Sequence, residues 1–222
     1  METNDDSVNY LSVRKINKIS EKTFQQIKNN LLNDQYMEEL KNFIINFECS
    51  LKLNSSTIAI GSLAPLAKLI ESSYGGDNDY KAEMLEKYKL YSKYIYNYRS
   101  VKGDGNCYYR AVIFRYIEIL LLERQISLLK DVIYDMYNCF YNEEITKRKN
   151  IKMNTIFKPE LPLKIMFLII NILENHNDLK LAYLIFIKSV LICPIFDFGL
   201  IFYLRFIFYE YIQENENKFF FK

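Results

Sequence analysis

Apolar residues recur at helical spacing along much of the chain. Over Phe24–Phe47 they fall three or four positions apart, with an interruption near Asn33, which predicts two consecutive helices. Residues 58–72 carry a similar pattern, and Pro65 suits the start of a helix there. Mixed charges over Tyr80–Tyr94 predict an exposed amphipathic helix.

The second half of the chain is richer in apolar residues. Aromatic and polar residues alternate over Tyr94–Ser100, which predicts an extended segment. Residues 107–141 predict a long, nearly continuous helical stretch, and 163–173 a further helix. Two apolar helices are expected at Leu179–Ile192 and Phe198–Tyr211. The predicted fold class is therefore mostly α.

Composition supports a core-forming protein. Half of the 222 residues are hydrophobic and 25% are charged, the balance of a globular chain. A formal net charge of +2 predicts no strong attraction to nucleic acid, so we expect no nucleic-acid partner. The tyrosine-rich run Tyr88–Tyr98 could stack on bases, but the balanced charge favours ordinary packing of these rings.

The apolar stretch Leu181–Phe208 raises the alternative of a membrane-associated helical protein. Lys188, Asp197 and Arg205 interrupt it. No charge-free run in it approaches the roughly 18–20 residues that a spanning helix needs. The pattern favours a buried helix pair over membrane association.

The chain starts with an acidic, polar segment that lacks the apolar region of a secretory signal. We therefore expect a reducing compartment, the cytoplasm and also the nucleus, in which cysteines stay thiols. The four cysteines are far apart and one histidine accompanies them, so we expect no structural zinc. Three of the cysteines are expected to be core fillers: Cys49, Cys139 and Cys193.

The segment 103–110 carries the most specific chemical signal. Gly103 and Gly105 permit tight, unusual backbone dihedral angles, and Cys107 opens a predicted helix. Free N–H groups at a helix N-terminus can hold an oxyanion, and their field favours a reactive thiolate. The alternative is an ordinary turn and helix cap followed by a core cysteine.

The run Asp-Gly-Asn-Cys-Tyr-Tyr-Arg-Ala at 104–111 resembles the nucleophile motif of the OTU (ovarian tumour) deubiquitinating cysteine proteases, with the otubain branch most similar. Fainter similarity extends over residues 58–221. We therefore expect an OTU/otubain-like domain at 58–222, incomplete at its C-terminus, after a polar and helical N-terminal extension at 1–57. The resemblance implies part of an α+β papain-like fold, with most of its sheet outside this chain.

The resemblance also implies roles for single residues. Cys107 would be the nucleophile that attacks the carbonyl of ubiquitin's C-terminal glycine. Asp104 would be the catalytic-motif aspartate near the oxyanion hole, which Gly105 and Asn106 would line. Arg110 would be structural or electrostatic support, or equally a surface helix arginine.

The implied activity is that of a deubiquitinase, a thiol protease that hydrolyses isopeptide bonds without a cofactor. Its implied partners are ubiquitin or polyubiquitin and a ubiquitin-conjugating enzyme. The rings of Tyr108 and Tyr109 would pack behind the nucleophile.

The family also needs a histidine base near the C-terminus of its catalytic domain, and we expect the chain to stop before that segment. The only histidine, His176, matches no family position and lies in a polar linker, where we expect it to be solvent-exposed. Two alternatives follow: an inactive relative that binds ubiquitin or a ubiquitin-conjugating enzyme, or a partial gene model.

Overall fold

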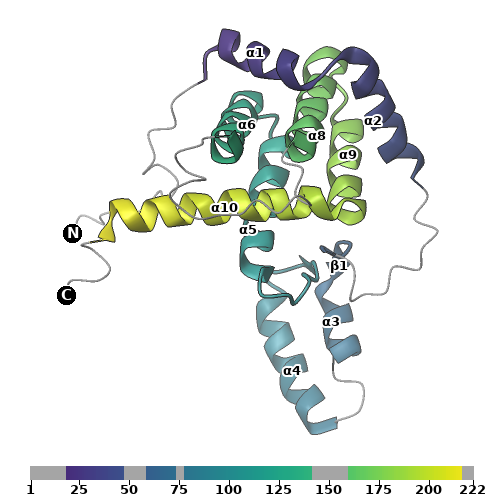
Figure 1. The fold of residues 1–222 in the computed structure, drawn as a ribbon. Helices are drawn as coiled ribbons and strands as arrows, with labels where there is room; N and C mark the ends of the chain where they lie inside the picture. The colour runs from purple at the N-terminus through teal and green to yellow at the C-terminus, as the bar shows by residue number, and fades with distance from the viewer. Residues whose placement is uncertain (1–18, 48–58, 74–77, 142–159, 217–222) are drawn as a thin grey trace, which may run out of the picture.

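The computed structural model describes residues 19–47, 59–73, 78–141 and 160–216. Over these ranges the chain is mostly helical and contains one small antiparallel sheet, which confirms the predicted fold class and fits the helical part of an OTU fold. Figure 1 shows a helical bundle from which α3 and α4 extend. In chain order the elements are α1 (Glu21–Leu31), α2 (Asp34–Asn46), β1 (Ala64–Pro65), α3 (Leu66–Ser73), α4 (Asn78–Tyr91), β2 (Asn97–Tyr98), α5 (Cys107–Leu122), α6 (Ile126–Tyr141), α8 (Glu160–Asn171), the π-helix η1 (Ile172–His176), α9 (Leu179–Ile192) and α10 (Pro194–Glu214).

The first helices begin where their capping residues stand. The Ser20 hydroxyl accepts the Thr23 N–H at the start of α1. The Asn33 side chain accepts the Tyr36 N–H at the start of α2, which confirms the predicted interruption. α3 begins directly after Pro65, as the sequence predicts.

The predicted helical stretch over 107–141 is wrong in one respect, because it breaks into α5 and α6. Arg124 has a left-handed φ of 53°, and its N–H donates to the Leu121 carbonyl. The Gln125 N–H donates to the Leu120 carbonyl at 2.8 Å. These two bonds form a Schellman cap. The left-handed position is normally glycine, so an arginine there leaves no stop signal in the sequence.

The core centres on α8, which is buried along nearly its whole length and packs against α6, α9 and α10. α1 and α2 pack on the same core (Figure 1). The rings of Phe24 and Phe167 lie 5.0 Å apart between centroids, joining α1 to α8. The N-terminal helices therefore share one core with the C-terminal ones, and the division of the chain at residue 57 stays a prediction.

The small sheet leads the chain into α5. β1 and β2 are antiparallel, with Ala64 opposite Tyr98, and an isolated bridge joins Ile60 to Val101. The expected extended segment is confirmed at β2. Beyond β2 the Gly61 N–H donates to the Ser100 carbonyl at 2.8 Å, and a Cβ atom at Gly61 would collide with the Ser100 side chain. This close pairing fixes the chain just before the turn that precedes α5.

Two sequence expectations concern the apolar helices and the tyrosine-rich run. Among the described helices none alone is long and apolar enough to cross a membrane; α9 and α10 pass that test only as a pair, and they are bent by 96° at their junction. Packing of the tyrosine-rich run is wrong for Tyr91, Tyr94 and Tyr96, whose side chains are exposed.

Candidate active site

The turn before α5 holds the motif residues in one compact loop. Gly105 has a φ of 79°, in the left-handed region that favours glycine. The Asp104 Oδ1 atom accepts the Asn106 N–H at 3.0 Å and closes the turn. Gly103 has no left-handed φ, and a Cβ atom there would meet nothing within 4 Å. Of the two glycines, only Gly105 takes a conformation that needs one, so that expectation is wrong for Gly103.

Cys107 is the first residue of α5, and its side chain is exposed. The alternative of a core cysteine is therefore wrong. Within the described ranges, the backbone N–H groups of Cys107 and Tyr108 have no hydrogen-bond acceptor. These groups point out of the positive end of the helix, where they can bind an anion that forms beside the thiol.

Arg110 is buried beneath this turn, with 1% of its surface exposed. Its Nη1 and Nη2 atoms donate to the two Asp104 carboxylate oxygens at 2.9 and 2.8 Å. Its Nε atom donates to the Asp197 carboxylate of α10 at 2.9 Å. The alternative of a surface arginine is wrong, and the residue supports the turn from inside.

Both carboxylates bind the same guanidinium, yet their pKa values shift in opposite directions. Hydrogen bonds from Arg110 hold the pKa of Asp104 well below its ordinary value, against a smaller effect of burial. Burial raises the pKa of Asp197, and Arg110 opposes that shift. Asp197 is the deeper of the two, with 7% of its side chain exposed against 22% for Asp104. Depth thus accounts for the difference.

α10 touches the turn at a second point. The Arg205 Nη2 atom donates to the Asn106 Oδ1 atom at 2.8 Å, and its guanidinium lies 4.6 Å from the Tyr109 ring centroid. Tyr109 also meets Phe208 edge-on at 5.9 Å. Packing behind the nucleophile is therefore found for Tyr109, whereas Tyr108 is 60% exposed.

The sequence analysis missed Asp197 and Arg205 as members of this site. It used both only as charges that interrupt an apolar stretch. A signal was nevertheless present, because a lone carboxylate within an apolar helix needs a buried cationic partner. The sequence does not reveal that this partner is Arg110.

His176 lies elsewhere, at the exposed end of η1. It lines a cavity together with Asp34, Glu38 and Lys41 of α2. The neighbours of the turn before α5 belong instead to α10 and to α5 itself. The structure therefore does not bring His176 to Cys107.

The other two described cysteines are buried or half-buried. Cys139 is buried in the core, and burial raises the pKa of the half-buried Cys193. Cys49 lies outside the described residues. In the part of the chain that the structure describes, no group of three His, Cys, Asp or Glu residues could hold a metal ion.

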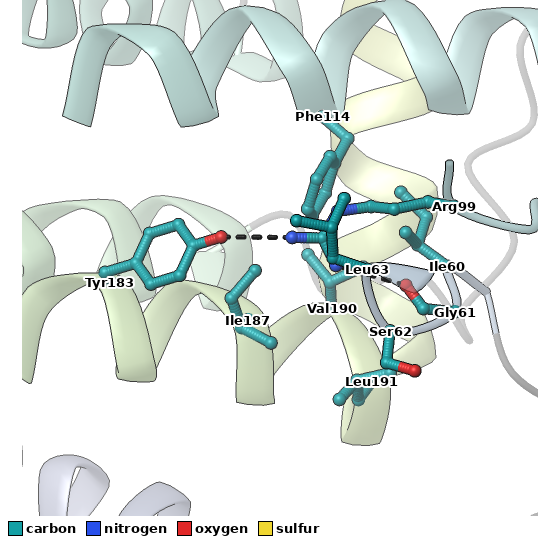
Figure 2. Close-up of a pocket in the computed structure, with 10 residues that line it drawn as sticks. All are labelled: Ile60, Gly61, Ser62, Leu63, Arg99, Phe114, Tyr183, Ile187, Val190 and Leu191. Carbon is teal, nitrogen blue, oxygen red and sulfur yellow. Dashed lines mark hydrogen bonds between the residues drawn. The ribbon is translucent and has the colours of Figure 1, made fainter. Parts of the chain in front are cut away.

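A cavity of about 200 Å³ lies beside the small sheet (Figure 2). The Arg99 guanidinium crosses it and donates to the Tyr183 hydroxyl at 3.1 Å and to the Gly61 carbonyl at 3.2 Å. Its other walls are mainly apolar, and none of the residues 104–107 lines it. This cavity is therefore separate from the turn that carries Cys107.

Comparison with known proteins identifies the family of this chain. The family model of the peptidase C65 otubains matches residues 53–221, which include the whole turn and α10. A protein described as "Ubiquitin thioesterase otubain-like" from Caenorhabditis elegans is 38% identical over 65 residues, which are 29% of this chain and 22% of that relative. No solved structure matches. The resemblance seen in the sequence is confirmed, and the chain belongs to the otubain family of C65 peptidases.

Proposed function

We propose that this protein is a cysteine-type deubiquitinase that cleaves isopeptide bonds at the C-terminus of ubiquitin, with Cys107 as nucleophile. The observation that carries the proposal is the exposed thiol at the start of α5, beside N–H groups without acceptors, on a turn anchored by Arg110. The name of the matched relative, a ubiquitin thioesterase, supports ubiquitin as the modifier.

The proposed reaction has two steps. The Cys107 thiolate attacks the carbonyl carbon of ubiquitin's last residue, and the N–H groups of Cys107 and Tyr108 receive the developing oxyanion. The C–N bond breaks, the lysine amine takes a proton from water as it leaves, and a thioester forms. Water then attacks the thioester, which releases the ubiquitin carboxylate and restores the thiol.

A ubiquitin derivative with an electrophilic C-terminus tests this proposal. Under reducing conditions we expect a covalent adduct whose mass maps to the peptide containing Cys107. Cys107→Ser should form none, whereas Cys193→Ser, which changes a half-buried thiol at the start of α10, should react like the wild type. Absence of an adduct on the wild-type protein would contradict the proposed activity.

A second candidate function is binding of ubiquitin, or of a ubiquitin-conjugating enzyme, without hydrolysis. The observation in its favour is the position of the single histidine, which borders α2 rather than Cys107. Calorimetric titration of Cys107→Ala with each of the two partners tests it. Heat of binding together with no adduct on the wild type favours this candidate, and no binding at high micromolar concentration removes it.

A further inference from the structure

Asp197 is a buried carboxylate that lies outside the nucleophile motif. It is the fourth residue of α10, and 7% of its side chain is exposed. Both of its oxygens accept hydrogen bonds from Arg110, at 2.9 Å and 3.1 Å from Nε and at 3.0 Å from Nη2. A carboxylate this deep is stable only with such a partner, so the pair is a fixed unit of the fold.

The other edge of the same guanidinium faces the turn. Nη1 and Nη2 donate to the two oxygens of Asp104 at 2.9 and 2.8 Å, and Nη1 also donates to the Lys102 carbonyl at 3.1 Å. Asp104 in turn accepts the Asn106 N–H, one residue before Cys107. A continuous series of hydrogen bonds therefore runs from α10 to Asn106, the residue before the nucleophile.

The hydrogen bonds of Arg110 to Asp104 depend on those to Asp197, because the guanidinium is planar and rigid. With asparagine at 197, one of the two acceptor oxygens becomes an NH2 donor, so one buried guanidinium N–H would lose its acceptor, and the fork would turn to regain one. Such a rotation would carry the two Nη atoms out of line with Asp104. The turn would then lose the support that sets the direction of the first N–H groups of α5.

We propose that Asp197 is a positioning residue for Cys107, acting through Arg110 and Asp104. This inference rests on the proposed function for its effect on ubiquitin, but its geometric part can be measured without ubiquitin. Arg205 strengthens the same arrangement, since it holds Asn106 from two turns further along α10. α10 would thus set the geometry of the turn at two points.

The test compares Asp197→Asn with Glu118→Gln. Glu118 is a matched control because it is also a buried carboxylate paired with arginine, and it lies on α5, bound to Arg99, Arg115 and Tyr183 rather than to the turn. The first measurement is the hydrogen-exchange rate of the Asn106 amide by NMR. The second is the kinetics of adduct formation with the ubiquitin electrophile.

We expect Asp197→Asn to speed exchange at Asn106 and to lower the rate constant at saturating electrophile by roughly tenfold or more, because small displacements of a reacting group cost rate steeply. The electrophile concentration for half-maximal rate should stay near that of the wild type. Glu118→Gln should change neither quantity. A role in stability alone would lower the fraction of protein labelled rather than the rate constant.

The outcomes separate this proposal from the proposed function. If the wild type forms no adduct, the proposed activity fails, and exchange at Asn106 alone decides the role of Asp197. Wild-type exchange at Asn106 in Asp197→Asn overturns the positioning role, as do equal effects of the two variants. If Asp197→Asn does not fold, Asp197→Glu replaces it; this variant keeps the charge but shifts the carboxylate, and the same exchange criterion applies.

Discussion

At the scale of single residues, the two glycines of the turn have different tasks. Gly105 has a left-handed φ of 79°, whereas Gly103 does not and has open space around it. Alanine at 105 would be strained by about 1–2 kcal/mol. We expect Gly105→Ala to lower the free energy of unfolding by about this amount in urea denaturation. Gly103→Ala is the matched control and should stay close to the wild type; equal losses in both variants would contradict the assignment.

Ionisation of Asp104 should make the free energy of unfolding depend on pH. Its pKa in the folded protein lies below that of the unfolded chain, chiefly because Arg110 donates to it. Its contribution is therefore present above about pH 4 and is lost as the pH falls further. The raised pKa of Asp197 acts in the opposite direction. Burial, its largest cause, is common to the wild type and to a variant at 104, whereas the Asp104 charge adds a smaller rise in the wild type alone.

We therefore expect the difference in unfolding free energy between the wild type and Asp104→Asn to be constant near neutral pH and to shrink progressively as the pH falls below about 4. Urea denaturation at several pH values measures it. A difference that persists unchanged to the lowest pH would show that Arg110 does not stabilise the ionised form.

How much of the site could be predicted depends on how far apart its residues lie in the sequence. The turn residues and Cys107 are contiguous, so a local motif reveals them. Asp197 stands 87 positions from its partner Arg110, and only folding brings them together. Burial of Arg110 was likewise left open in the sequence, because an arginine on a helix can face either way.

At the scale of elements, hydrophobic periodicity predicts helices well and their ends less well. α1 and α2 follow their apolar spacing, since one face of each packs on the core, whereas α9 and α10 are apolar around most of their circumference. The break between α5 and α6 was missed because Arg124 adopts the left-handed conformation at the cap. A bulky side chain at that position carries no local signal.

Packing of α1 on the core contributes to the stability of the fold, although most of the residues of α1 are polar. Phe24 is buried against Phe167, and the Lys130 ammonium lies 4.8 Å from its ring centroid. We expect Phe24→Ala to lower the free energy of unfolding by about 3 kcal/mol, the usual cost of such a cavity. Chemical denaturation should show one transition.

Lys22→Ala is the control for this prediction, because Lys22 lies on the exposed face of the same helix. It should change stability by less than about 0.5 kcal/mol. A Phe24→Ala variant as stable as the control would mean that α1 does not contribute to the common core.

At the scale of the whole molecule, Arg99 ties the small sheet to the bundle. Its guanidinium binds Gly61 and Tyr183 of α9 and lies over the Phe114 ring (Figure 2). It also binds Glu118 of α5. We expect Arg99→Met to cost about 2 kcal/mol, the usual worth of buried hydrogen bonds to charged groups. Native-state hydrogen exchange should accelerate at the amides of the sheet.

Arg115→Met provides the comparison, because Arg115 pairs with the same Glu118 carboxylate but is 61% exposed. Exposed ion pairs contribute at most about 1 kcal/mol, so exchange in the sheet should remain close to that of the wild type. Faster sheet exchange in Arg115→Met than in Arg99→Met would contradict the role given to Arg99.

The contact of α10 with the nucleophile turn has a consequence for protein synthesis. The ribosome makes Arg110 and Cys107 long before it makes Asp197 and Arg205. Because chains fold from the N-terminus as they emerge, the guanidinium stays without its second carboxylate until α10 is translated. The order of translation therefore places assembly of the reactive site after the helices that precede α10 have begun to form.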